Sequence, residues 1–176
     1  MKKKTNFKWL IRIVLISVAA SMVFTLASTE ILGRAGYILS FAVLAVFVII
    51  GIVFDMIGVA ATAAKEAPFH SMAAHRERGA ADALRLLKSA DKVSSFCNDV
   101  VGDVSGIVSG STAAMIAARL MQGINAENAL FSLLISGAVT GLTIGGKAAG
   151  KTFAFNNCTA IVLAVGRLIA AFRRER

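Results

Sequence analysis

Proline, tryptophan and tyrosine are scarce in this chain, and each occurs only once among its 176 residues. A nucleic-acid-binding protein combines basic residues with exposed aromatic side chains, so one tryptophan and one tyrosine argue against that class. The single proline, Pro68, is expected to mark the bend where the chain leaves a membrane span for a cytoplasmic helix.

Cysteine is also scarce, with two residues, and catalytic motifs are missing. Cys97 and Cys158 have no companion cysteines and no metal-ligand spacing, so we expect free thiols and no disulfide framework. His70 and His75 do not form the H-E-x-x-H pattern, and we expect both on the surface. No Ser-His-Asp order accompanies an oxyanion loop, and the segment GLTIGGK lacks the Ser or Thr that a phosphate-binding loop needs. The chain is therefore not expected to be an enzyme, and we expect no cofactor apart from a possible Mg²⁺.

Acidic residues are few, with 10 Asp and Glu against 19 Lys and Arg, which gives a net charge of +9. Hydrophobic residues make up 57% of the chain, and the mean hydropathy is +0.74. Long runs without charge favour membrane spans over a small soluble domain. The basic residues flank these runs, which is typical of a cytoplasmic membrane surface.

The apolar runs predict an all-α membrane protein with four transmembrane helices, at residues 9–32, 38–64, 93–118 and 129–145. A cleavable signal peptide is the alternative for the first run, although the run is long for one and no A-x-A site closes it. The segment 65–92 predicts a cytoplasmic amphipathic belt helix over about residues 73–88, and the stretch 158–172 predicts a C-terminal interfacial helix. Three parts follow: an additional N-terminal span and loop at 1–37, a transmembrane core at 38–145 and a cytoplasmic juxtamembrane tail at 146–176.

The distribution of charge predicts how these spans are oriented. With a cytoplasmic N-terminus, Lys2 to Lys4, the segment 65–92 and the tail all lie inside. Outside remain Arg34 and Arg119, which Glu30 and Glu127 balance. This is the positive-inside pattern, and it predicts a multi-pass protein of the cell membrane with both termini cytoplasmic.

Two stripes of glycine recur at every fourth residue of the third and fourth spans. Small residues at this spacing let membrane helices approach closely, so the stripes indicate a tight hairpin or the seam of a homodimer. Plain tolerance of glycine in membrane helices is the alternative. The residues are Gly102, Gly106, Gly110, Gly137, Gly141 and Gly145.

The third span is two-faced. One face carries Asn98, Asp99, Asp103 and Ser105, and the other carries valines such as Val104 that can meet lipid. A charged Asp at the centre of a bilayer costs about 2.5–3.5 kcal/mol, so we expect both carboxylates to face protein and a positive partner. The alternative is that both lie near the cytoplasmic end of the span and reach water.

Three segments resemble motifs of the CNNM/CorC-type transmembrane domain, between Phe54 and Arg176 and in the family's order. RGAADALRLLKSADKVSS (residues 78–95) is similar to the cytoplasmic belt segment, and VGD (101–103) is similar to the I-G-N start of the next span. GKAAGKTFA (146–154) resembles the motif G-E-x-x-P-K-[ST]-x-A. The resemblance implies a dimeric membrane protein of magnesium transport, regulated in the family by CBS domains that follow the spans. This chain ends where those domains begin, so we expect a separate regulatory subunit as a possible partner, together with the lipid bilayer and a second copy.

The chain departs from the family motifs where their cation ligands stand. Ile57-Gly58 replaces a small-Ser-Glu bend, and Lys147 and Gly150 replace the Glu and Pro of the last motif. Two hypotheses follow. In the first, the chain transports a divalent cation such as Mg²⁺ through a displaced site, with Asp99, Asp103 and Asp55 as carboxylate ligands and Asn98 and Ser105 assisting. In the second, Lys147 takes the place of the cation and pairs with Asp99 or Asp103, and the chain is a non-transporting scaffold or partner subunit.

Overall fold

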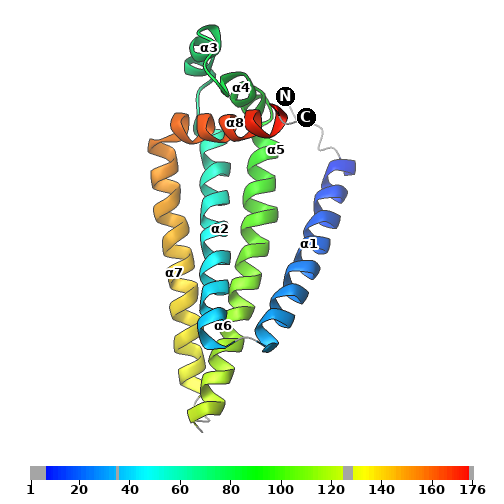
Figure 1. The fold of residues 1–176 in the computed structure, drawn as a ribbon, viewed down its shortest axis with the longest axis vertical. Coiled ribbons are helices and arrows are strands. Elements are labelled where there is room, and N and C mark those ends of the chain that lie inside the picture. Colours follow the sequence, from blue (N-terminus) through cyan, green and yellow to red (C-terminus); the bar gives the residue numbers. More distant parts are fainter. Residues whose placement is uncertain (1–6, 35, 125–128, 175–176) are drawn as a thin grey trace. The chain divides into compact units, whose positions relative to one another are not determined.

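The computed structural model describes residues 7–34, 36–124 and 129–174, and all regular secondary structure in these ranges is helical (Figure 1). The elements are α1 (Phe7–Arg34), α2 (Tyr37–Ala63), α3 (Glu66–Ala74), α4 (Ala80–Lys88), α5 (Ala90–Ser95), a π-helix η1 (Phe96–Gly102), α6 (Asp103–Ile124), α7 (Ala129–Asn156) and α8 (Cys158–Arg174). The predicted all-α class is confirmed. The basic start at Lys2 to Lys4 and Glu127 of the predicted turn lie outside the described residues.

Among the described residues, three helical segments are long and apolar enough to cross a membrane: Tyr37–Ala63, Ala90–Leu120 and Leu133–Asn156. They cover all of the third predicted span and most of the second and fourth. The first predicted span falls in α1, whose apolar part, Ile11–Leu26, is shorter. At 28 residues and 1.5 Å per residue, however, α1 as a whole is about 42 Å long.

Two predicted boundaries are wrong. The sequence predicts a fourth span at 129–145, whereas α7 continues to Asn156, because no proline or turn interrupts the sequence after Gly145. It predicts a belt helix over about 73–88, whereas α3 ends at Ala74 and α4 begins at Ala80. The chain turns between them at Arg76 and Gly79, whose φ angles of 56° and 86° are left-handed and end a helix.

The chain bends after α2 close to the position that Pro68 predicts. The chain leaves α2 through Ala64 and an extended Lys65, and Pro68 follows in the first turn of α3. A proline is tolerated there because the first turn of a helix has no intrahelical partner for its N–H.

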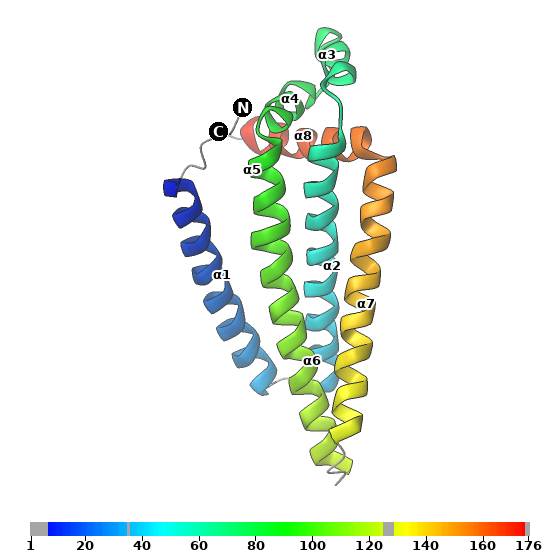
Figure 2. The same ribbon diagram turned by 180° about the vertical axis from the view of Figure 1, so that it is seen from behind.

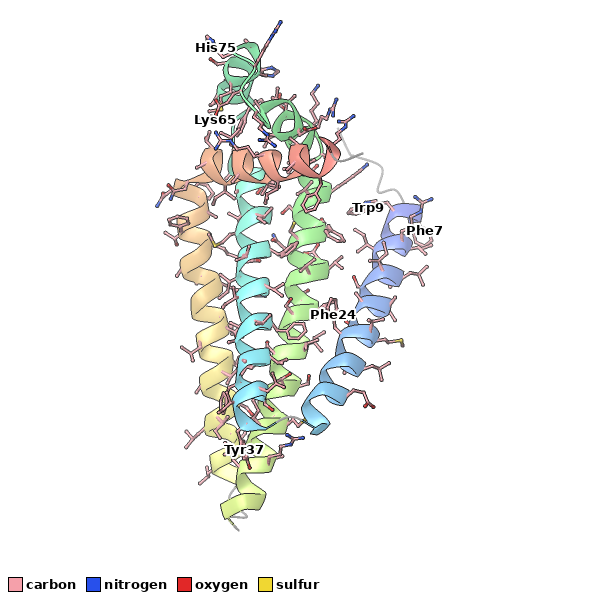
Figure 3. All side chains as sticks on the ribbon, viewed as in Figure 1. Phe7, Trp9, Phe24, Tyr37, Lys65 and His75 are labelled. Carbon is pink, nitrogen blue, oxygen red and sulfur yellow. The ribbon has the colours of Figure 1, made fainter. Side chains whose placement is uncertain are left out.

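The chain divides into two compact units: a first unit of Met1–Gly51 and Val100–Gly145, and a second unit of Ile52–Asp99 and Gly146–Arg176. In the first unit, α1 packs against α6. Phe24 of α1 meets Phe47 of α2 edge to face, with ring centroids 5.8 Å apart. The hydroxyl of Tyr37 donates a hydrogen bond to the carbonyl of Arg119 (3.4 Å). Figure 3 labels Phe24 and Tyr37 in this unit.

The second unit is built around the contact between α4 and α8. Figures 1 and 2 both show α8 lying across the ends of α2 and α7, with α4 against it. The core between them is apolar, and Phe69 of α3 is fully buried in it. Burying such a ring contributes about 3 kcal/mol. The other buried members are Ala60, Ala61, Ala80, Ala83, Leu86, Leu87, Ala154, Val162 and Leu163.

Two glycines allow α4 and α8 to approach this closely. A Cβ added to Gly166 would lie 2.5 Å from the carbonyl oxygen of Gly79 and 3.0 Å from the Cβ of Ala83. A Cβ on Gly79 would lie 2.5 Å from the backbone nitrogen of Arg167. The contact is closed at the surface by an ion pair from Arg167 to Glu77, with Nη2 and Oε1 2.8 Å apart.

We expect Gly166→Ala to destabilise the second unit by about 1–3 kcal/mol, because the added methyl group overpacks the seam between α4 and α8. Thermal unfolding of the detergent-solubilised chain is measured in a Cys158→Ser background. The signal is the reaction of the Cys97 thiol, which is buried in the folded chain, with a fluorogenic maleimide. The matched control is Gly137→Ala on α7, where nothing lies within 4 Å of an added Cβ. An equal loss of stability in both variants would contradict the close packing of α4 on α8.

Candidate functional site

Asp55 is the buried carboxylate of α2, and only 4% of the residue is exposed. It lies within a helix long and apolar enough to span a membrane, among residues such as Val53 and Met56. A charged Asp in such a position costs about 2.5–3.5 kcal/mol without a partner. The structure supplies a partner from α7.

Lys151 of α7 provides the compensating charge. Its Nζ lies 3.4 Å from Oδ2 of Asp55, close enough for an ion pair. The same oxygen is nevertheless without a hydrogen-bond donor, so the ammonium is near the carboxylate but not directed at it. We take the pair as a charge contact without a hydrogen bond, because the Coulomb attraction depends on distance and hardly on direction.

The lysine is not enclosed. Its side chain is 54% exposed, whereas that of Asp55 is 6% exposed. It lines an open hollow of about 460 Å³ together with Val59, Thr152, Phe155 and Asn156. A long aliphatic stem with its charge at the end can therefore leave the carboxylate and extend into the hollow.

Asn98 places a second polar group on the same part of α2. Its side chain lies against Gly58, one helical turn after Asp55, and any Cβ at residue 58 would collide with it. Asn98 Nδ2 donates a hydrogen bond to Oγ of Ser94 (3.3 Å). Its Oδ1 is buried and has no hydrogen-bond partner. Among the described residues, Asp55 Oδ2 and Asn98 Oδ1 are the two buried side-chain oxygens that lack a hydrogen-bond partner.

Asn98 belongs to the π-helix η1, which joins α5 to α6. A π-helix makes i→i+5 hydrogen bonds and is a frequent feature of functional sites.

Small residues of α7 bring Lys151 within reach of α2. A Cβ on Gly146 would lie 2.6 Å from Cδ1 of Ile52, and one on Gly150 would lie 3.0 Å from Cγ of Met56. Ala154, four residues further along, is fully buried. Residues 146, 150 and 154 recur at every fourth position, like the glycines of the predicted stripes. The predicted stripes do not include these three residues, because the fourth span is predicted to end at Gly145.

The predicted acidic site is not formed as expected. Asp99 and Asp103 are both exposed, whereas Val100, Val104 and Val108 are 5% exposed or less. The expectation that both acids face the interior and the valines face lipid is therefore wrong. The two acids do share one face and the three valines another, as their spacing predicts, but the valine face is the one that packs against the protein. Burial of the apolar face leaves the carboxylates exposed and avoids the cost of burying a charge without a partner. Ser105, which is predicted on the same polar face as the two acids, is buried, with 4% of the residue exposed.

Lys147 is half-buried on α7, one turn before Lys151. Among the described residues, Asp99 has no ion-pair partner within the second unit, and Asp103 has none within the first. On α7, Lys151 forms an ion pair with a carboxylate of a candidate span, that of Asp55.

The glycine stripes do not form a tight contact within their own unit. Nothing lies within 4 Å of a Cβ added to Gly106, Gly110, Gly137, Gly141 or Gly145, although Gly102 is buried. The predicted hairpin seam is therefore wrong for these five positions. The seam of a homodimer stays a prediction.

The available ligand set limits what the site can bind. In the described ranges, no three His, Cys, Asp or Glu side chains gather around one point. A cation at Asp55 would thus have a single carboxylate ligand together with water, and Asn98 Oδ1 lies against Gly58, one turn further along α2. Mg²⁺ commonly binds through one or two carboxylates and keeps several waters, so this set suits a weak, hydrated site.

The remaining predictions concern side chains outside this site. His70 and His75 are both exposed, as expected, and His70 Nε2 lies 3.6 Å from Oε2 of Glu66 (Figure 3 labels His75). Cys97 and Cys158 are free, as predicted.

Comparison with family models, with curated proteins and with solved structures found no match to the chain.

We expect Asp55 and Lys151 to be energetically coupled. Lys151→Met leaves a buried carboxylate without its counter-charge, whereas the double variant with Asp55→Asn removes both charges and regains most of the stability. The coupling energy from the double-mutant cycle is expected at about 1–3 kcal/mol, measured by thermal or denaturant unfolding in detergent micelles.

The control is a second double-mutant cycle, in which Lys147 is mutated and Lys151 is kept. Lys147 lies on the same helix one turn earlier. Lys147→Met combined with Asp55→Asn should show a coupling below about 0.5 kcal/mol. Equal coupling in the two cycles would mean that the positive charge of α7 acts as a whole and that no specific pair exists.

Proposed function

We propose that this chain is a multi-pass protein of the cell membrane that transports a divalent cation such as Mg²⁺. The proposal combines the resemblance to the CNNM/CorC-type transmembrane domain with the chemistry at Asp55. Four spans and two cytoplasmic termini accord best with the positive-inside distribution of charge. The ends of two helices carry interfacial aromatics: Phe7 and Trp9 in the first turn of α1, and Tyr37 at the start of α2 (Figure 3).

One observation carries the proposal. Asp55 Oδ2 and Asn98 Oδ1 are both buried and both lack a hydrogen-bond donor. Buried polar atoms are nearly always satisfied, and an exception calls for an unseen ion or water. Hard oxygens of a carboxylate and an amide are suitable ligands for Mg²⁺ or Ca²⁺.

Lys151 then acts as a tethered counter-ion. Without a bound cation its ammonium neutralises Asp55, and an arriving cation displaces it into the open hollow that it already lines. The lysine in this role replaces Lys147 of the earlier hypothesis. It prevents an unneutralised carboxylate in the membrane when the site is empty.

The alternative function is a non-transporting scaffold or partner subunit in which Lys151 stays on Asp55 permanently. The ion pair itself favours this alternative, because the site offers a single carboxylate against a full positive charge. A divalent cation has to overcome the repulsion of the ammonium before it reaches its ligands.

Thermal stabilisation of the purified chain by Mg²⁺ separates the two functions. Under transport, millimolar MgCl₂ raises the melting temperature of the wild type above that in NaCl of equal ionic strength, Asp55→Asn abolishes the rise, and Lys151→Gln enlarges it. Under the locked alternative, the wild type shows no rise, and Lys151→Gln creates one.

Lys147→Gln is the matched control, because it removes the same charge from the neighbouring turn of α7 and should leave the Mg²⁺ response unchanged. Entry of Mg²⁺ into proteoliposomes with a trapped Mg²⁺-sensitive dye then measures transport directly. Absence of any Mg²⁺ response in both the wild type and Lys151→Gln would overturn the assignment of a cation site to Asp55.

A further inference from the structure

The outer side of α8 is apolar near its C-terminal end. Leu168 and Phe172 are 60% and 75% exposed and lie on the side of α8 that points away from Val162 and Leu163, which pack in the core with α4. Ile169, at the edge between the two sides, is 42% exposed. An amphipathic helix with a second apolar face needs a second apolar environment.

The position of α8 indicates which environment this is. α8 begins at Cys158, two residues after the end of the apolar segment Leu133–Asn156, and it lies across the ends of α2 and α7 (Figures 1 and 2). The end of a membrane-spanning segment coincides with the bilayer surface. The exposed side chains of α8 therefore lie at the depth where headgroups meet acyl chains.

The charges beside this face are unbalanced. Arg85 of α4 and Arg173 of α8 both direct Nη1 at the same oxygen of Asp82, at 3.0 Å and 3.4 Å. One carboxylate thus serves two guanidinium groups, and the group keeps one positive charge in excess. Both arginine side chains are more than 60% exposed, so their remaining donors are available to another anion.

We propose that the Arg85–Asp82–Arg173 group, together with the apolar side chains of α8, binds an anionic phospholipid of the surrounding bilayer. The guanidinium groups would bind the headgroup phosphate, whose geometry suits the planar fork of arginine. Phe172, Ile169 and Leu168 would contact the upper acyl chains. The inference goes beyond cation transport and rests only on the membrane placement proposed above.

The probe is phosphatidylglycerol, with phosphatidylcholine as its zwitterionic counterpart. Native mass spectrometry of the full detergent-purified chain counts the lipids retained at each concentration. We expect the wild type to retain phosphatidylglycerol in preference to phosphatidylcholine. Arg173→Gln should weaken phosphatidylglycerol retention about fivefold, as one charge near an anionic surface is worth about 1 kcal/mol.

A second variant keeps the test independent of folding defects. Asp82→Asn frees both arginines and should strengthen phosphatidylglycerol retention, which a general loss of structure would not do. Lys65→Gln, an exposed lysine ahead of α3, removes the same charge elsewhere in the second unit and should leave retention unchanged (Figure 3). Phe172→Ser should weaken the retention of both lipids.

Equal retention of the two lipids by the wild type, or an equal loss in Lys65→Gln and Arg173→Gln, would overturn the proposal. Competition by millimolar inorganic phosphate would also overturn it, because it would indicate a site for free anions. Carbonate extraction of the chain from its native membrane tests the membrane placement separately. Failure there is distinguishable from failure of lipid selectivity, and neither outcome depends on Mg²⁺.

Discussion

The carboxylate of Asp55 has to be neutralised where it stands, inside the apolar helix α2, and the second unit is arranged accordingly. Lys151 supplies the charge from α7, and its ammonium lies 3.4 Å from Oδ2. The lysine reaches Asp55 because Gly146 and Gly150 of α7 allow a close approach to α2, where they lie against Ile52 and Met56. The ion pair thus depends on residues that carry no chemistry of their own, and without them the acid would face hydrocarbon alone.

The same unit keeps its other elements in place by close backbone approach. Gly79 and Gly166 set the distance between α4 and α8, and the pair Glu77–Arg167 closes the contact at the surface. Ion pairs this exposed contribute little to stability, so the apolar core around Phe69 carries most of the energy. A layer held in this way exposes arginine and apolar side chains together, as the proposed phospholipid site requires.

Sequence reasoning predicted the helical class and four spans, and the second, third and fourth of these fall in helices that are long and apolar enough to cross a membrane, because apolar runs of this length have few other structures available. It also named Asp55 and Asn98 among the candidates. It named Lys147 as the candidate, from its place in the motif GKAAGKTFA, and not Lys151, which forms the ion pair with Asp55. It placed Asp99 and Asp103 inside because a charged Asp that faces lipid is costly, whereas the structure leaves both exposed and buries Val100 and Val104 on the other face.

The distance between the two charged groups tests the central claim most directly. In the chain reconstituted in lipid bilayers, solid-state NMR can measure the dipolar coupling between ¹⁵Nζ of lysine and ¹³Cγ of aspartate, with Lys151→Arg and Asp55→Asn spectra assigning the signals. The ion pair described above is expected to give clear dephasing that both substitutions remove, in keeping with a 3.4 Å contact between Nζ and Oδ2. A coupling that survives either substitution, or none at all in the wild type, would contradict a neutralised Asp55 and with it the account of the site.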